Sequence, residues 1–398
     1  MREMDFTERN LYCRWMGVKS IWRLIEDSAI NETKSQLEGA LRIDLENRLG
    51  CSRYERSRKR QGYRNGSYTR DFLTRYGWIR DLEIPRARDS HYQPRVLERY
   101  RRRERFIDRA LLEAFLLGHS TRNTTRLFKR LFGGSMSAQT VSNIAKELNL
   151  EAEHFHRHRF SGEYDCLHLD GLWITLSKPV KAKKVILVAL GVRADGTKDL
   201  LSFQVASSES ESCWWGFVSD LKDRGLKGEM IEVIVSDGAA GLRKAIEALY
   251  PRVRHQLCTF HKANDLGSHL SNRTHRNRII ADALHIFEAA HVIDVRKRLK
   301  KFIAKWRPKE PKAVRNFLRN FESCLVYIDY PEPLRTRFKT NNQIERYIQE
   351  IRRRIIPMRT FNNTKSAERI AYGIIAYTLN QNTLDMPKSN LSEITQSA

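Results

Sequence analysis

The alternation of apolar and polar residues is the clearest regular signal in the middle of this chain. Residues 164–176 (YDCLHLDGLWITL) alternate, residues 185–192 are continuously apolar, and residues 200–205 form a third short run after a turn at 194–197. Alternation is typical of a half-buried strand, and a short apolar run bounded by turn residues is typical of a buried one. We therefore expect three antiparallel strands joined by tight turns.

The pattern then changes to strands separated by helices. We expect a helix at 213–224, a strand at 231–235, a helix at 239–250 that Pro251 ends, and a strand at 254–258. Strands that alternate with helices favour a βαβ arrangement. The sequence therefore predicts an α/β fold with a mixed sheet flanked by helices. Residues 266–338 have a helical pattern almost throughout and form an expected all-helical insertion.

The N-terminal part has a different rhythm. Residues 61–88 contain short runs broken by turn residues, which predicts a small basic β element. Three helices are expected after it, at 108–117, 121–132 and 138–148, with glycines between them. This is a helix-turn-helix candidate, although many three-helix bundles share the rhythm without binding DNA.

The third of these helices has one apolar and one polar side. Its expected buried stripe is Val141, Ile144, Ala145 and Leu148, and Ser137 is its expected N-cap. The residues expected to face outward, where amide side chains could read base edges in a major groove, are Gln139, Thr140, Asn143 and Lys146.

Charge narrows the class of partner. The chain carries 72 Lys and Arg against 47 Asp and Glu, a net charge of +25 over 398 residues. Residues 51–150 have 23 basic and 10 acidic side chains, residues 151–250 have 13 and 15, and residues 251–350 have 21 and 10. A field of this sign attracts polyanions, so nucleic acid is the default partner, although some of these residues are simply solvated helix faces.

Other compartments and partners are less favoured. The longest apolar run, 185–192, is far shorter than the roughly 20 residues of a membrane-spanning helix, and the first ten residues contain no apolar signal segment. Six cysteines spread singly do not suggest a disulfide framework. We expect a cytoplasmic protein with no membrane partner.

Two aspartates fall at places where a sheet could bring them together. Asp170 lies within or just past the first expected strand, and Asp237 directly follows the strand at 231–235. Neighbouring strands of an open α/β sheet present such residues at one edge, where ligands bind. Read alone, Asp237 could simply cap the helix that follows it.

Glu345 is placed by the start of its own helix. Thr340 as N-cap and Gln343 reaching back fit a capping box, so the helix is expected to begin just before the glutamate. Its expected buried stripe is Ile344, Ile348, Ile351 and Ile355. Glu345 could be an ordinary first-turn glutamate. If it meets Asp170 and Asp237, the three carboxylates could hold two divalent cations that reach substrate phosphates.

These blocks resemble the Mutator-type transposases of bacterial insertion sequences. The matching text is V-S-D-G at 235–238, Y-P at 250–251, C-x-x-H at 258–261, N-D-L at 264–266, T-N-N-Q-I-E at 340–345 and R-R-R at 352–354, with further similarity at 63–66, 84–88 and 118–122. The resemblance spans roughly residues 60 to 380. It implies a ribonuclease H-like fold with an Asp-Asp-Glu triad at Asp170, Asp237 and Glu345.

The resemblance also implies an activity and its partners. Such enzymes cut and join DNA at terminal inverted repeats with two Mg²⁺ ions, for which Mn²⁺ is a substitute. Two element ends must be brought together, which predicts a homodimer on double-stranded DNA, associated with the nucleoid. The alternatives are a structure-specific nuclease on the same fold and a catalytically inactive, transposase-derived DNA-binding protein.

The remaining candidates lie around this triad. His255, Cys258 and His261 invite a zinc interpretation, but a structural zinc site needs four ligands, so we expect Cys258 and His261 to shape the site from behind the ligands. Two arginine runs could grip phosphates. They are Arg101, Arg102, Arg103 and Arg105, and Arg352, Arg353, Arg354 and Arg359.

Together these patterns predict a division of the chain. The expected parts are an N-terminal helical region (1–60), a small basic β element (61–105), a helix-turn-helix DNA-binding domain (106–150), the first part of the catalytic core (160–265), a helical insertion (266–338), the C-terminal helices of the core (339–382) and a tail (383–398).

Overall fold

The computed structural model describes residues 6–88, 92–98, 101–177, 179–358 and 360–378. Two compact units divide the chain: an N-terminal unit of Met1–Phe115 with Thr121–Ile144, and a sheet unit of Leu116–Ser120 with Ala145–Ala398. The expected tail at 383–398 and the candidate Arg359 lie outside the described residues.

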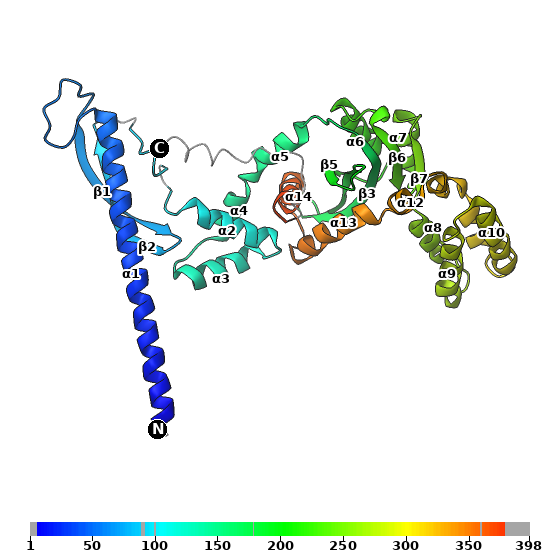
Figure 1. Cartoon of the computed structure of the whole chain (residues 1–398), viewed down its shortest axis with the longest axis horizontal. Helices are drawn as coiled ribbons and strands as arrows, with labels where there is room; N and C mark the ends of the chain where they lie inside the picture. Colours follow the sequence, from blue (N-terminus) through cyan, green and yellow to red (C-terminus); the bar gives the residue numbers. More distant parts are fainter. Residues whose placement is uncertain (1–5, 89–91, 99–100, 178, 359, 379–398) are drawn as a thin grey trace. The chain divides into compact units, whose positions relative to one another are not determined.

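The N-terminal unit is built on a long helix and a hairpin. Helix α1 (Phe6–Leu49) lies beside the antiparallel strands β1 (Arg64–Thr74) and β2 (Gly77–Ala87) (Figure 1). Leu41 of α1 packs with residues of the hairpin, including Phe72 and Ile79. The small β element expected at 61–88 is therefore a two-stranded hairpin.

Three helices complete this unit. They are α2 (Arg105–Leu116), α3 (Thr121–Phe132) and α4 (Ala138–Ala145), close to their predicted positions. The Ser137 hydroxyl accepts the Thr140 N–H at 3.1 Å, which confirms the predicted N-cap of α4. The predicted stripe is buried, but the helix is shorter than expected, because α5 (Leu148–Arg157) begins as a separate helix at Leu148.

The sheet unit contains a five-stranded mixed sheet in the order β5-β4-β3-β6-β7. Its strands are β3 (Tyr164–Leu176), β4 (Ala182–Val192), β5 (Lys198–Ala206), β6 (Ile231–Ser236) and β7 (Arg254–Leu257). The first three pair antiparallel, whereas β6 pairs parallel to both β3 and β7. This is the predicted meander followed by βαβ, and the predicted mixed sheet is confirmed.

Each face of the sheet is covered by helices. Helices α6 (Glu211–Asp223) and α7 (Ala240–Leu249) bury Trp214 and Leu242 against Leu167 and Leu169 of β3. Cys166 and Val235 belong to the opposite face and pack with the helical region that follows β7. Because side chains alternate along a strand, Asp170 shares this second face with Cys166.

The region after the sheet is largely helical, as expected. Its helices are α8 (Thr259–Asp265), α9 (Arg276–Phe287), α10 (Val292–Trp306), α11 (Pro311–Leu318) and α12 (Glu332–Phe338). The buried Glu310 accepts the Ser271 N–H at 2.6 Å and the Asn272 N–H at 3.0 Å, and pairs with His275 at 2.8 Å. One carboxylate therefore ties the loop before α9 to the start of α11.

Two helices end the described chain, α13 (Asn342–Ile355) and α14 (Thr364–Thr378). The four isoleucines expected to form the buried stripe of α13 are buried. Short 3₁₀ segments connect the longer elements at Gly228–Met230, Leu266–Ser268, Arg273–His275, Glu322–Cys324, Val326–Asp329 and Ile356–Met358. Within the described ranges, no helix combines the length and the apolar character needed to cross a bilayer.

Candidate functional site

The register of two parallel strands gives the two aspartates matching positions. β3 and β6 pair Tyr164 with Ile231 and His168 with Val235, an offset of 67 residues. Asp170 and Asp237 are separated by the same 67 residues, so each lies two positions beyond the last pair. Asp170 is inside β3, which continues to Leu176, whereas Asp237 directly follows β6.

Glu345 lies in the first turn of α13, but the helix begins differently from the prediction. The residue before the helix is Asn341, and no side chain caps the helix end. The predicted capping box of Thr340 and Gln343 is therefore wrong. The physical reason is that the Asn341 side chain is committed to contacts outside its own helix.

Asn341 is fully buried and joins three parts of the site. Its Oδ1 lies 3.0 Å from His168 Nδ1, its Nδ2 donates to the Leu169 carbonyl at 3.2 Å, and its backbone N–H donates to Cys258 Sγ at 3.3 Å. Burial lowers the pKa of His168 to about 4, so the ring is neutral and its Nδ1–H donates to Asn341. The start of α13 is thereby fixed against β3, beside Asp170.

Electrostatics connects the three carboxylates. Burial, together with the negative charges of Asp237 and Glu345, raises the pKa of Asp170 to about 7. The Gly171 N–H, which bonds Asp170 Oδ1 at 2.8 Å, and the nearby His261 act in the opposite direction. Because such charge effects fall with distance, the three acidic side chains lie in one neighbourhood.

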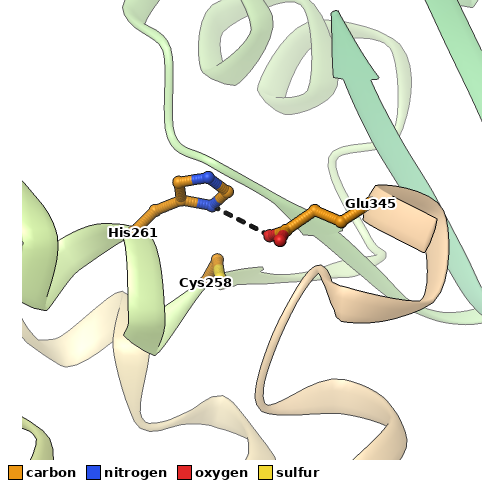
Figure 2. Close-up of side chains that lie close together, drawn as sticks. All are labelled: Cys258, His261 and Glu345. Carbon is orange, nitrogen blue, oxygen red and sulfur yellow. Dashed lines mark ion pairs between the residues drawn. The ribbon is translucent and has the colours of Figure 1, made fainter. Parts of the chain in front are cut away.

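A thiol and an imidazole accompany the glutamate. Ligand atoms of Cys258, His261 and Glu345 all lie within 4.8 Å of one another, and Figure 2 shows the His261 ring facing the Glu345 carboxylate. His261 Nδ1 is 3.7 Å from Glu345 Oε1. The Cys258 sulfur raises the pKa of His261 to about 9 against the effect of burial, and the charges of Glu345 and Asp170 add to the rise.

His255 is not part of this group. Its Nε2 lies 2.8 Å from the Ser236 hydroxyl, and burial lowers its pKa to about 4. Among the described residues, the possible metal-binding set is Cys258, His261 and Glu345, and His255 is not part of it. The three members of the H-x-x-C-x-x-H text therefore do not act as one ligand set.

The sequence did not single out one further carboxylate, Glu209, in the loop between β5 and α6. A Cβ added to Gly171 would lie 2.3 Å from Glu209 Oε1, so this carboxylate rests directly on the backbone next to Asp170. Burial raises the pKa of Glu209, the charge of Asp237 raises it further, and a hydrogen bond from Trp173 lowers it. No periodic pattern surrounds Glu209, so only the fold reveals its position.

Most arginines of the first predicted run form ion pairs within the protein. Arg101 pairs with Glu98 and Asp108, Arg103 pairs with Asp108, and Arg105 pairs with Glu98. Arg102 is exposed. In this run, three of the four guanidinium groups therefore have acidic partners within the protein.

Arg352, Arg353 and Arg354 of the second run lie on α13. Arg352 and Arg353 are exposed, and Arg353 pairs with Glu350 at 2.7 Å. Arg354 is buried and also bonds Glu350, so its guanidinium is not presented to solvent. On α4, Gln139 and Asn143 are exposed and Thr140 is half-buried, and Lys146, just after the helix, is exposed. The Gln139 amide donates to Asn143 Oδ1 at 3.0 Å, which joins two of the predicted base-reading side chains.

The fold and the site define a mixed α/β protein with acidic side chains gathered beside a parallel strand pair. The family described as "Transposase, Mutator family" matches residues 17–382, so the chain belongs to the Mutator family of transposases. The resemblance inferred from the sequence motifs is therefore confirmed.

Several curated transposases are similar over most of their length. The transposase for insertion sequence element ISRM5 of Rhizobium meliloti is 30% identical over 91% of this chain and 90% of its own. The transposase for element IS256 in transposon Tn4001 of Staphylococcus aureus is 32% identical over 82% of this chain and 84% of its own.

Among solved structures, a chain of the simian T-cell lymphotropic virus intasome in complex with the PP2A regulatory subunit B56 gamma matches 52% of this chain. The match covers 64% of that chain at 12% identity, with a TM-score of 0.18.

Proposed function

We propose that this transposase cuts and joins DNA at a ribonuclease H-like site formed by Asp170, Asp237 and Glu345. The observation that carries the proposal is the common offset of 67 residues, which matches the two aspartates across the parallel strands β3 and β6. The raised pKa of Asp170 supports it, because Asp237 and Glu345 both contribute to the rise. Perturbed carboxyl groups of this kind cluster at functional sites.

The donor set fits Mg²⁺, with Mn²⁺ as a substitute. Carboxylate oxygens are the ligands that these hard cations take, and Glu345 Oε1 is a buried oxygen without a hydrogen-bond partner in the described residues. Two bound ions would activate water and stabilise the leaving 3′ oxygen in an in-line displacement of the phosphodiester. Asp170, Asp237 and Glu345 would hold them, and the freed 3′-OH would then attack target DNA in the same site.

The surrounding residues position this chemistry. Asn341 fixes the start of α13 against β3, so it holds Glu345 near Asp170. The exposed Arg352 and Arg353 follow about two turns after Glu345 on α13, where they would bind phosphates beside the cut. Cys258 and His261 lie beside Glu345 and would orient its carboxylate.

Recognition of the element ends is assigned to α2–α4. We propose that these helices act as a helix-turn-helix, with Gln139, Thr140 and Asn143 of α4, and Lys146 just after it, directed at bases of the terminal inverted repeats. The substrate is double-stranded DNA, and a homodimer would pair two ends on the nucleoid. The expected helical insertion and the other domain boundaries belong to the same proposal.

Strand transfer tests the proposal directly. Purified protein, labelled element-end DNA and a target plasmid should give Mg²⁺-dependent nicking and joined products. Asp237→Asn and Glu345→Gln should each reduce cleavage by at least about 100-fold, whereas Asp223→Asn, which changes an exposed carboxylate on α6, should leave it unchanged.

The alternatives predict different products. Nicking without joining would favour a nuclease on the same fold. DNA binding without any Mg²⁺- or Mn²⁺-dependent nicking would overturn the catalytic proposal and leave a transposase-derived DNA-binding protein. Size exclusion with end DNA tests the dimer, and a monomer on paired ends would contradict it.

A further inference from the structure

The cluster of Cys258, His261 and Glu345 has a ligand chemistry different from that of the two aspartates. Its donors are one sulfur, one imidazole nitrogen and one carboxylate oxygen. Thiolate and imidazole suit zinc-class cations, whereas Mg²⁺ prefers oxygen ligands alone. We propose that these three residues form a separate site for a thiophilic divalent cation of the zinc class, with Glu345 shared between this site and the catalytic carboxylates.

The geometry is close to what such an ion needs. Cys258 directly follows β7 and His261 lies three residues later in α8, so both side chains come from one helical turn. Ligands around tetrahedral zinc are about 3.4–3.6 Å apart, given bonds of about 2.0–2.3 Å. The Nδ1 atom of His261 and Oε1 of Glu345 are 3.7 Å apart, and all three ligand atoms lie within 4.8 Å. Small side-chain movements would complete the set, leaving one tetrahedral position for water.

Two buried atoms point to a missing partner. His261 Nδ1 and Glu345 Oε1 are both shielded from solvent, and neither makes a hydrogen bond of good geometry in the part of the chain that the structure describes. Buried polar atoms are normally hydrogen-bonded, and the 3.7 Å ion pair between these two atoms, marked in Figure 2, is too long to be a hydrogen bond. A cation between them would satisfy both atoms.

The third ligand is prepared by its neighbours. Cys258 is fully buried, and its sulfur accepts the backbone N–H of Asn341 at 3.3 Å. The Cys258 N–H donates to the Ser236 carbonyl at 2.8 Å, which holds the residue at the end of β7. Such outer contacts orient a ligand before the ion arrives.

Sharing Glu345 has a functional consequence, which rests on the proposed function. A cation held by Cys258 and His261 withdraws Glu345 from Asp170 and Asp237, so zinc-class ions should inhibit DNA cleavage in the presence of Mg²⁺. Binding itself does not depend on that function, and it is measured separately.

Cobalt(II) is the probe for binding, because thiolate ligation gives a strong near-ultraviolet charge-transfer band. The full-length protein, reduced and free of DNA and Mg²⁺, should bind one equivalent and show the band. Cys258→Ser should lose the band, and His261→Gln should weaken cobalt affinity by about tenfold or more. Cys213→Ser is the matched control, since Cys213 is the more exposed thiol and should not contribute.

The outcomes separate the two proposals. Absence of the band in the wild-type protein, or its persistence in Cys258→Ser, overturns the site. If Cys258→Ser loses its native circular dichroism, the cobalt affinity of His261→Gln is the deciding measurement. An unchanged affinity in that variant also overturns the proposed site. In the cleavage assay, Zn²⁺ should inhibit the wild type and affect Cys258→Ser at least about tenfold less. Failure of cleavage in every variant would refute the proposed function. The cobalt titration would still decide whether Cys258, His261 and Glu345 form a cation site.

Discussion

Asp170 shows how one half-buried carboxyl connects stability to pH. Its pKa is raised to about 7, well above the ordinary value of 3.8 that applies to the unfolded chain. Between these two pH values Asp170 holds a proton in the folded protein but not in the unfolded chain. The stability of the wild type therefore falls as pH rises from about 4 to about 7. A neutral isostere at this position removes that loss.

We therefore expect Asp170→Asn to resemble the wild type in stability near pH 4 and to be more stable above pH 7. The shift corresponds to a difference on the order of 2–4 kcal/mol in the free energy of unfolding. Urea denaturation in metal-free buffer from pH 4 to 8 measures it, with Asp223→Asn as the control. Parallel profiles for wild type and Asp170→Asn would contradict the prediction.

Asn341 permits a second test at the scale of one residue. Asn341→Ala leaves His168 Nδ1 and the Leu169 carbonyl without their buried partner. We expect a loss of about 2–4 kcal/mol in the free energy of unfolding. The exposed neighbour Asn342 supplies the matched control, since Asn342→Ala should change stability by less than about 0.5 kcal/mol.

The same variants test how Glu345 is held. If Asn341 positions the start of α13, Asn341→Ala should also reduce Mg²⁺-dependent cleavage under conditions where the variant remains folded. Equal stability and equal cleavage for the two alanine variants would show that the contacts of Asn341 are dispensable.

Sequence reasoning found the residues whose position follows from a local pattern. Asp170 and Asp237 are marked by the strands that carry them, and their spacing anticipates the register of β3 with β6. It could not find Asn341, because the partner His168 is 173 residues away in the chain. Glu209 was missed for the same reason: its closeness to Gly171 is created by the fold, and no periodicity marks the loop.

At the scale of elements, periodicity predicted the strands and most helices. The meander followed by βαβ was predicted from alternating and apolar runs separated by turns, and the mixed sheet confirms it. Helix ends were less certain: the α4 pattern continued to Leu148, whereas the helix stops at Ala145. The capping box before α13 failed because a buried side chain had stronger tertiary partners than the helix end.

Glu310 is the element-scale counterpart of Asn341. Its side chain is fully buried and accepts two backbone N–H groups and the His275 ring, so it fixes the loop before α9. Glu310→Ala should lower the free energy of unfolding by about 2–4 kcal/mol, because the N–H groups of Ser271 and Asn272 lose their acceptor. Limited proteolysis and urea denaturation measure the effect.

A matched control is available for this prediction. Glu332 is exposed at the start of α12, so Glu332→Ala should change stability by less than about 0.5 kcal/mol. Cleavage within residues 266–311 at the same rate in both variants would show that Glu310 does not anchor the loop.

At the scale of the whole molecule, the number of basic side chains overstates how many unpaired cations DNA would meet. The chain has 72 Lys and Arg residues, but Arg101, Arg103, Arg105 and Arg353 have acidic partners, and Arg354 is buried. Residues 151–250 carry 13 basic and 15 acidic side chains. They contain every strand of the five-stranded sheet except β7. The charge pattern therefore separated a nearly neutral central segment from basic flanking segments.

Salt dependence measures how many of these charges contact phosphate. Each contact lowers the slope of log K against log salt concentration by about 0.9, so an arginine that binds phosphate is visible in the slope. Arg352 is exposed on α13 and is the member of its run for which we expect this role. Arg352→Ala should reduce the magnitude of the slope by about 1, equally for element-end DNA and unrelated DNA.

Lys222 provides the comparison, because it is an exposed cation on α6 whose Nζ bonds the Leu249 carbonyl. Lys222→Ala should leave the slope unchanged. An unaltered slope in Arg352→Ala would show that Arg352 does not contact phosphate. Cleavage by that variant would then show that the catalytic carboxylates can engage DNA without this arginine. A slope reduced only on element-end DNA would instead mean that Arg352 contacts DNA only in the specifically bound complex.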